Sequence, residues 1–266
     1  MDVMNKPIIL TMKWGSVFSS DYVNVLYNAC KAACTQDFRF VCLTDDPSGF
    51  DREIEHYPIP DISLTHDEWY TSGVWPKLSV YSVNLHNLEG RCLFIDLDMM
   101  VLNDLDSLLD YPHPFVTTDM GQGWRPGGNA SPAEAGTSIF AFNLGQEAQI
   151  LNKFVANKNL AKSEYQNEQD FVGKHASSMA YWPAGWVISF KRWLRQPIGK
   201  DLFVPPHRPP PETKILAFHG VPRPTDLLKS KFHFWDRFPH MGHGRVEWVA
   251  DYWERNGGRV IVKSGV

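Results

Sequence analysis

The sequence predicts an α/β fold that opens with parallel strands, and three neighbouring segments carry this prediction. The apolar runs 7–12 and 38–43 are typical of buried strands. Between them, residues 21–33 repeat apolar side chains close to helical spacing, with Ser20 or Asp21 as the N-cap. A strand, a helix and a strand within the first 45 residues form a βαβ unit, for which a right-handed crossover between parallel strands is expected.

Length and composition predict one large domain, or one domain with an appendage. The chain has 266 residues, of which 43% are hydrophobic, and this is enough to bury a large core. Its formal net charge is −4, which argues against a basic surface that binds nucleic acid. We therefore expect no nucleic-acid partner.

The cysteines and the apolar runs predict a cytoplasmic protein. Cys30, Cys34, Cys42 and Cys92 include no C-x-x-C pair, so free thiols in a reducing compartment are the simplest interpretation. No apolar run approaches the roughly 20 residues that span a bilayer, and the first residues lack the apolar region of a signal peptide. We expect no membrane span.

Two acidic residues end the apolar run in segment 91–102 (RCLFIDLDMMVL). Because side chains alternate along a strand, Asp96 and Asp98 would share one face, with Cα atoms roughly 6.6 Å apart. Two carboxylates this close repel each other unless a cation lies between them, and carboxylate oxygens suit Mg²⁺ or Mn²⁺. The segment therefore predicts a metal site; the plain alternative is that both residues only cap the strand or the following turn.

The rest of the chain alternates between strand and helix patterns and contains one long loop. Further strands are expected at 53–58, 114–118 and 137–143, a helix at 78–83 and another at 146–156, a helical turn at 105–109, and a Gly-rich candidate mobile lid at 121–134. Neither G-x-G-x-x-G nor GK[ST] follows the first strand, which argues against a Rossmann dehydrogenase and a P-loop NTPase.

Three further positions are candidates for a site. Lys77 would lie in the first turn of a helix after Pro76, where the helix dipole slightly disfavours a cation. A lysine in this position suggests an anionic partner, although a solvated surface lysine is the commoner arrangement. Asn167 is a candidate N-cap, with Asp170 three positions further on. A cap would account for the presence of Asn167 and Asp170 but not for that of Glu168 and Gln169, which leaves a site plausible there. A late strand at 214–218 ends in His219-Gly220, after the stiff proline segment 205–211.

The order of these parts resembles the GT-A glycosyltransferases. The resemblance is closest to the glycogenin-like and bacterial galactosyltransferase-like branch, which uses nucleotide-diphosphate sugars, and it covers residues 7–224. It implies a mixed, mostly parallel central sheet flanked by helices. It also implies a GT-A domain at 1–224, divided into a nucleotide-binding half (1–100) and a sugar and acceptor half (101–224), followed by an aromatic-rich appendage at 225–266.

The resemblance also assigns roles to individual residues. Asp96, Asp98 and His219 would bind Mn²⁺ or Mg²⁺, and Glu168, Gln169 and Asp170 would be the catalytic residues at the sugar. Contacts to the donor nucleotide sugar would come from Thr11, Lys13, Trp14, Lys77, Leu97, Ser138, Gly220 and Arg223, with Arg223 replacing a lysine of the family. This chain departs from the family pattern at Glu168, where the family has Asp, and in the segment after His219.

These assignments imply a metal-dependent hexosyltransferase. It would move a sugar from a nucleotide-diphosphate sugar, in which UDP is the expected nucleotide, to a hydroxyl of a glycan or glycolipid. Two alternatives stay open. The first is a phosphohydrolase of the haloacid dehalogenase class, whose first strand also ends in Asp-x-Asp. The second is a carbohydrate- or nucleotide-binding protein without turnover, since several of the ten tryptophans lie beside polar or turn residues.

Overall fold

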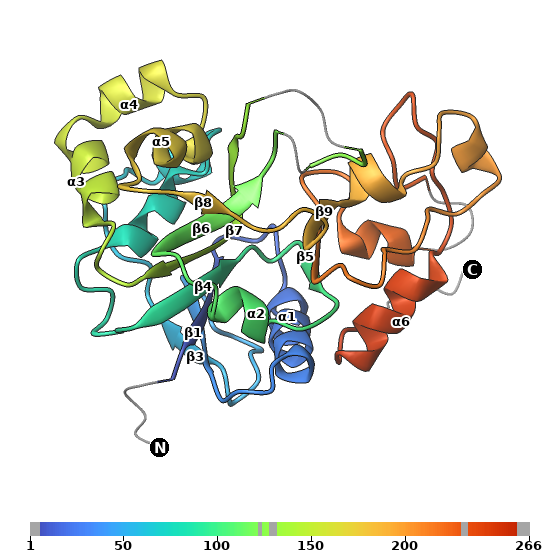
Figure 1. The fold of residues 1–266 in the computed structure, drawn as a ribbon, viewed down its shortest axis with the longest axis horizontal. Coiled ribbons are helices and arrows are strands. Elements are labelled where there is room, and N and C mark those ends of the chain that lie inside the picture. The colour runs from blue at the N-terminus through green and yellow to red at the C-terminus, as the bar shows by residue number, and fades with distance from the viewer. Residues whose placement is uncertain (1–5, 122–123, 128–131, 230–233, 260–266) are drawn as a thin grey trace.

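The computed structural model describes residues 6–121, 124–127, 132–229 and 234–259. A seven-stranded sheet with the order β3-β2-β1-β4-β7-β6-β8 forms the centre of the molecule (Figure 1). Its strands are β1 (Ile8–Lys13), β2 (Arg39–Thr44), β3 (Glu55–Tyr57), β4 (Arg91–Ile95), β6 (Phe115–Asp119), β7 (Ala135–Asn143) and β8 (Ala180–Tyr181).

The sheet is mixed and mostly parallel, as expected. β1 is parallel to β2 and β4, β2 is parallel to β3, and β6 is parallel to β8. Only β7 runs antiparallel to its neighbours, β4 and β6. The predicted βαβ unit is confirmed, because helix α1 (Ser20–Ala33) joins the parallel strands β1 and β2. Its carboxyl strand ends point to one edge, where ligands of such sheets bind.

A second, smaller sheet breaks the predicted strand at 91–102. It contains β5 (Met99–Val101), β9 (Val187–Ser189) and β10 (Ile215–Ala217), with β10 antiparallel to β5 and parallel to β9. The chain leaves β4 after Ile95 and turns, with Met99 N–H donating to the Asp96 carbonyl at 3.3 Å. The prediction that Asp96 and Asp98 alternate along one strand is therefore wrong, because both lie in a turn between two sheets.

Helices cover both faces of the large sheet. Besides α1, the described helices are α2 (Asp106–Leu109), α3 (Ala148–Ala156), α4 (Lys158–Glu164), α5 (Glu168–His175) and α6 (Glu247–Arg255), with 3-10 turns at Asp67–Tyr70, Trp75–Tyr81, Lys200–Leu202 and Pro224–Leu228 and a π turn at Phe190–Leu194. The helix expected at 78–83 is thus a 3-10 helix that begins earlier. The expected lid at 121–134 lies partly outside the described residues.

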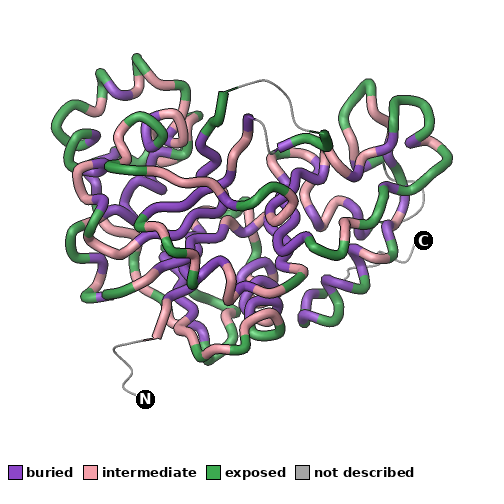
Figure 2. The backbone as a smooth tube through the Cα atoms, viewed as in Figure 1, coloured by how far each residue is buried: buried purple, intermediate pink, exposed green. Residues whose placement is uncertain are grey.

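Two hydrophobic clusters follow from the alternation of side chains along the central strands. Ile9 and Leu93 point to the face covered by α1, whereas Ile8, Leu10 and Phe94 point to the face covered by Trp75–Tyr81, α3 and α5. Figure 2 shows this burial concentrated along the sheet and beneath the helices. Both faces of the sheet are therefore apolar, as expected for a parallel sheet between helix layers.

Helix α6 packs into the first of these clusters although it lies in the predicted appendage. The Trp253 ring contacts the Tyr22 ring of α1 at 4.9 Å, edge to face, and the Tyr252 hydroxyl accepts the Val101 N–H at 3.0 Å. The division of the chain at residue 224 stays a prediction. No helix in the part of the chain that the structure describes is long and apolar enough to span a membrane.

We predict that Trp253→Ala lowers the free energy of unfolding by about 3 kcal/mol, because it removes a large buried ring from the contact between α1 and α6. Urea denaturation measures this change. The matched control is Asp251→Ala on the exposed side of the same helix, which we expect to stay within about 0.5 kcal/mol of the unchanged protein. Equal effects of the two substitutions would contradict the packing role of α6.

Candidate active site

A cavity of about 330 Å³ lies at the carboxyl ends of β1 and β4. Its floor is the turn that carries the two acids, and its sides come from the loop after β1 and from the segment before Lys77. The lining residues are Met12, Trp14, Val17, Phe18, Trp69, Tyr70, Thr71, Val74, Lys77, Asp96, Leu97 and Asp98. The cavity therefore joins charged groups of the predicted site to an aromatic wall.

Trp14, Trp69 and Tyr70 form this aromatic wall together with Phe18. The turn after Trp14 depends on Gly15, which has a φ of +61° and donates its N–H to Asp45 Oδ2 at 2.8 Å. A Cβ atom on Gly15 would lie 3.0 Å from the Tyr70 ring, so a side chain there would push against the wall. The loop after β1 thus brings aromatic rings over the ends of the strands.

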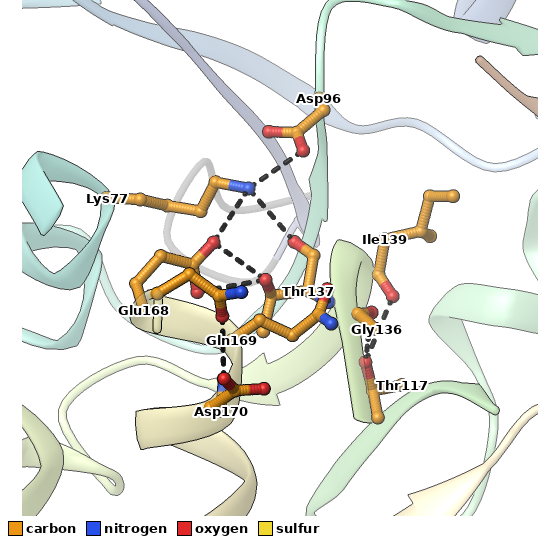
Figure 3. Close-up of polar contacts among 10 residues, drawn as sticks. Lys77, Asp96, Thr117, Gly136, Thr137, Ile139, Glu168, Gln169 and Asp170 are labelled. Carbon is orange, nitrogen blue, oxygen red and sulfur yellow. Dashed lines mark hydrogen bonds and ion pairs between the residues drawn. The ribbon is translucent and has the colours of Figure 1, made fainter. Parts of the chain in front are cut away.

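Lys77 is buried beneath this wall and connects three elements (Figure 3). Its Nζ lies 2.7 Å from Asp96 Oδ2 and 3.3 Å from Glu168 Oε1, and it donates to the Thr137 carbonyl at 3.3 Å. The side chains of Lys77 and Glu168 are each 6% exposed, and that of Asp96 is 26% exposed. The alternative of a solvated surface lysine is therefore wrong, and its anionic partners are Asp96 and Glu168.

Lys77 stays charged in this environment. Burial alone disfavours the ammonium group, but the carboxylates of Asp96 and Glu168 outweigh burial and raise the pKa of Lys77 above its usual value. Its Nζ also lies 5.2 Å from the centre of the Phe94 ring. One fixed positive charge thus sits at the edge of the cavity beside the acidic turn.

Glu168 is held in place by Thr137 of β7. The Thr137 hydroxyl lies 2.7 Å from Oε1 and 2.9 Å from Oε2 of Glu168, and Thr137 N–H donates to Gln169 Oε1 at 3.3 Å. Asn167 caps α5 as predicted, because its side chain accepts the Asp170 N–H at 2.9 Å. The start of α5 is therefore docked against β7, with Glu168 turned toward Lys77 (Figure 3).

Asp98 is the acid without an ion pair, since no cation of the described residues pairs with it. Burial, and then the nearby charge of Asp96, raise the pKa of Asp98 to about 8, while the positive charges of Lys77 and Arg223 act in the opposite direction. Two close carboxyl groups, of which one lacks a partner, form a donor set that suits a hard divalent cation. In this respect Asp96 and Asp98 fit a bound Mn²⁺ or Mg²⁺.

His219 is the third predicted metal ligand, but its side chain contacts residues other than the two acids. Its Nε2 lies 2.7 Å from the Ser189 hydroxyl, and its ring lies 5.5 Å from the ring of Trp124. Burial, and then the charge of Lys191, lower the pKa of His219 to about 4. Within residues 6–121, 124–127, 132–229 and 234–259, no group of three His, Cys, Asp or Glu side chains is arranged so that it could hold a metal ion.

The other predicted residues fall into two groups. Trp14 and Leu97 line the cavity, and the Ser138 carbonyl accepts the Asp96 N–H at 2.9 Å. Thr11, Lys13, Gly220, Arg223, Gln169 and Asp170 do not line it. Thr11 is fully buried, and Lys13 donates to the Asp46 carbonyl at 3.2 Å.

Arg223 lies beside the cavity, against Phe18. Gly220 has a φ of +73°, and the Arg223 guanidinium stacks 4.9 Å from the Phe18 ring. Arg223 lines a neighbouring cavity of about 380 Å³, which shares Val17 with the first one. A cation therefore lies behind the aromatic wall and acts on Asp98 through its charge.

Sequence reasoning missed Thr137 and Tyr70, and it selected Trp69 only as one of several tryptophans that lie beside polar or turn residues. Thr137 is followed by Ser138, which was selected, and only the position of α5 shows that the threonine faces Glu168. Trp69 and Tyr70 lie in a short 3-10 turn for which no element was predicted. An aromatic pair among polar residues was the available signal.

The arrangement defines the class of fold. A mixed sheet with the acidic turn after β4, together with structural matches over most of the chain, shows the GT-A glycosyltransferase fold. No protein-family model matches the chain, and no curated protein does either.

Three solved structures illustrate the likeness. The galactosyltransferase LgtC, in complex with donor and acceptor sugar analogues, is 13% identical, with a TM-score of 0.54 over 93% of this chain and 95% of that chain. The glycosyltransferase GlyE of Streptococcus pneumoniae TIGR4 is 11% identical, with a TM-score of 0.57 over 96% of this chain and 62% of that chain. The bifunctional glycosyltransferase WbbM is 14% identical, with a TM-score of 0.57 over 96% and 52%.

We predict that Thr137→Val lowers the free energy of unfolding by about 2 kcal/mol, because it removes a buried hydrogen bond to a charged carboxylate. The neighbouring strand offers a matched control, since the buried Thr118 hydroxyl has no hydrogen-bond partner. We expect Thr118→Val to change the unfolding free energy by less than about 0.5 kcal/mol. Chemical denaturation of both variants checks the difference, and equal losses would contradict the role of Thr137.

Proposed function

We propose that this protein is a metal-dependent glycosyltransferase that moves a hexose from a UDP-sugar to an acceptor hydroxyl. One observation carries the proposal. In a GT-A fold, the buried network of Lys77, Asp96 and Glu168 lies beneath an aromatic-walled cavity that also reaches Asp98. A charged floor suits a diphosphate, and an aromatic wall suits a base.

The nucleoside part of the donor would lie against the aromatic wall. Trp14 and Tyr70 offer faces on which a base can stack, and stacking favours every nucleobase. Lys77 and Arg223 would contribute positive charge near the diphosphate, with Lys77 held in position by two carboxylates. The choice of uridine rests on the resemblance to UDP-sugar enzymes and not on a contact of this chain.

Asp96 and Asp98 would hold the divalent ion. When bound, Mn²⁺ or Mg²⁺ stabilises the negative charge that develops on the leaving diphosphate. We propose His219 as a further ligand, because Ser189 fixes one ring nitrogen in the manner of histidine ligands that have a hydrogen-bonded partner. Thr11, Lys13, Leu97, Ser138 and Gly220 remain proposed donor contacts.

The start of α5 would orient the transferred sugar. Glu168 is turned toward Lys77, and moving it away would remove one of the two carboxylates that pair with this buried ammonium group. We propose that Glu168 and Gln169 set the position of the sugar hydroxyls and that Asp170 acts beside them, as the resemblance implies. The structure of LgtC holds donor and acceptor sugar analogues, and we extend such a pair of substrates, with a glycan or glycolipid acceptor, to this chain.

The fold favours the transferase over the haloacid dehalogenase alternative. The acidic turn follows β4 in the sequence and not the first strand, and the structures discussed above are glycosyltransferases. We also propose a reducing, cytoplasmic environment, because the four cysteines are free and three of them are buried. A binding protein without turnover is distinguished by whether UDP is released when sugar donors and acceptors are offered.

We predict that Asp98→Asn abolishes the Mn²⁺-dependent binding of UDP-sugars, because the amide removes one charged ligand at nearly constant volume. A thermal-shift screen of nucleotide sugars with and without Mn²⁺ measures the loss. Without metal, we expect the melting temperature to stay the same or rise, because the repulsion with Asp96 is removed. Unchanged Mn²⁺-dependent affinity would remove Asp98 from the metal site.

We predict that Trp14→Ala weakens UDP binding about tenfold, because a base would lose one stacking face. Isothermal titration with UDP measures this affinity. The comparison variant is Trp14→Phe, which keeps an aromatic face and should retain most of the affinity. Equal losses for both variants would show that the indole is not a stacking surface.

A further inference from the structure

Segment 61–74 contributes part of the aromatic wall of the cavity. Trp69 and Tyr70 come from this segment, and Thr71 and Val74 of the same segment also line the cavity. The segment belongs to neither sheet, and its one regular element is the 3-10 turn Asp67–Tyr70. Local opening is easiest where the backbone makes few hydrogen bonds to the rest of the protein. The contacts of a few side chains therefore decide where the two rings lie.

Helices α4 and α5, which both pack on α3, hold this segment in place (Figure 1). Three polar contacts join the segment to distant parts of the chain, and each comes from one of these two helices. They are Lys158 Nζ with the Ser63 carbonyl, Lys162 Nζ with Glu68 Oε1, and the Glu168 N–H with the Gly73 carbonyl at 2.8 Å. The helix that would orient the sugar thus belongs to the unit that also holds the aromatic wall.

Glu68 lies directly before the two rings and is bound through both carboxylate oxygens. Oε1 pairs with Lys162, and Oε2 accepts the Thr65 N–H at 2.7 Å. The Thr65 hydroxyl in turn accepts the Glu68 N–H at 3.4 Å. The hydrogen bond from Lys162, and then that from the Thr65 N–H, lower the pKa of Glu68 to about 2, so the carboxylate stays ionised near neutral pH.

The ion pair of Lys162 with Glu68 is shielded from water over most of its surface. The two side chains are 20% and 25% exposed. Exposed pairs contribute little, because water screens them and two free side chains must be ordered. Here the carboxylate is already oriented by Thr65, so the pair is suited to fix the conformation of the turn that carries the rings.

We propose that Lys162 and Glu68 are positioning residues for the nucleoside part of the donor. Their ion pair would hold Trp69 and Tyr70 where a base can stack, so that the wall is formed before the donor binds. A preformed wall lowers the entropy cost of ordering a loop on binding, which otherwise reduces affinity. The inference rests on the proposed function, because it concerns the same cavity.

The position of the ion pair predicts a local effect and not a general loss of stability. Ile62 and Leu64, in the first part of the segment, are buried in the second hydrophobic cluster. By contrast, Trp69 is half-buried and Tyr70 is 57% exposed. Without the ion pair, the second part of the segment could move while the apolar anchors of the first part stay in the core.

Isothermal titration of the full chain with UDP and with inorganic pyrophosphate, both in the presence of Mn²⁺, tests the proposal. Lys162→Met removes the charge at similar length and should weaken UDP binding about tenfold. Its affinity for pyrophosphate should stay within about twofold of that of the unchanged protein, because pyrophosphate has no base to stack. Lys162→Arg keeps the charge and should retain the UDP affinity.

A double-mutant cycle shows whether the two residues act as a pair. Glu68→Gln should weaken UDP binding as much as Lys162→Met does, and the double variant should lose no more than either single variant. The matched control is Lys174→Met, which removes an exposed lysine of α5 and should change neither affinity. Hydrogen exchange should rise in residues 65–71 of Lys162→Met and stay the same in the central strands.

The outcomes separate this inference from the proposed function. If the unchanged protein binds UDP and Lys162→Met binds it equally well, the positioning role is wrong and the proposed function stands. Equal losses of UDP and pyrophosphate affinity, or faster hydrogen exchange throughout the chain, would also overturn the positioning role. A failure of the unchanged protein to bind UDP would overturn the proposed function, and this inference with it.

Discussion

The buried ammonium group of Lys77 is the charge on which the arrangement of the site depends. A buried cation is tolerated only with close partners, and here Asp96 after β4 and Glu168 at the start of α5 provide them. The Glu168 N–H also donates to the Gly73 carbonyl at 2.8 Å, so α5 is bound to the segment that precedes Lys77. Three segments that are distant in the sequence are thereby fixed around one nitrogen atom.

The position of the two acids follows from the meeting of two sheets. Asp96 N–H donates to Ser138 of β7 in the large sheet, whereas the Asp98 carbonyl accepts the Phe218 N–H at 3.3 Å, directly after β10 of the small sheet. Each acid is therefore bound to a different sheet. The distance between their carboxylates is set by how the sheets pack and not by the repeat of a strand, which is why the alternation argument failed.

Local patterns predicted β1, α1 and β2 well, because strand and helix periodicity are properties of neighbouring residues. The same patterns placed Asn167 as a cap and selected the acidic turn. They could not predict the pairing of Lys77 with Glu168 or the hydrogen bond from Thr137, since both depend on how β7 and α5 pack.

The chemistry of His219 suits a metal ligand, but the orientation of its ring does not. The residue before it is bonded to Asp98, so the backbone brings His219 to the edge of the acidic turn. Its lowered pKa keeps the imidazole neutral near pH 7, which is the form that binds a metal, and Ser189 orients one nitrogen. The ring instead packs against Trp124, whose segment was expected to be a lid. The orientation of the His219 ring is therefore the reason that the described residues contain a pair of acids and not a three-residue metal site. Neither motif spacing nor strand pattern specifies this orientation.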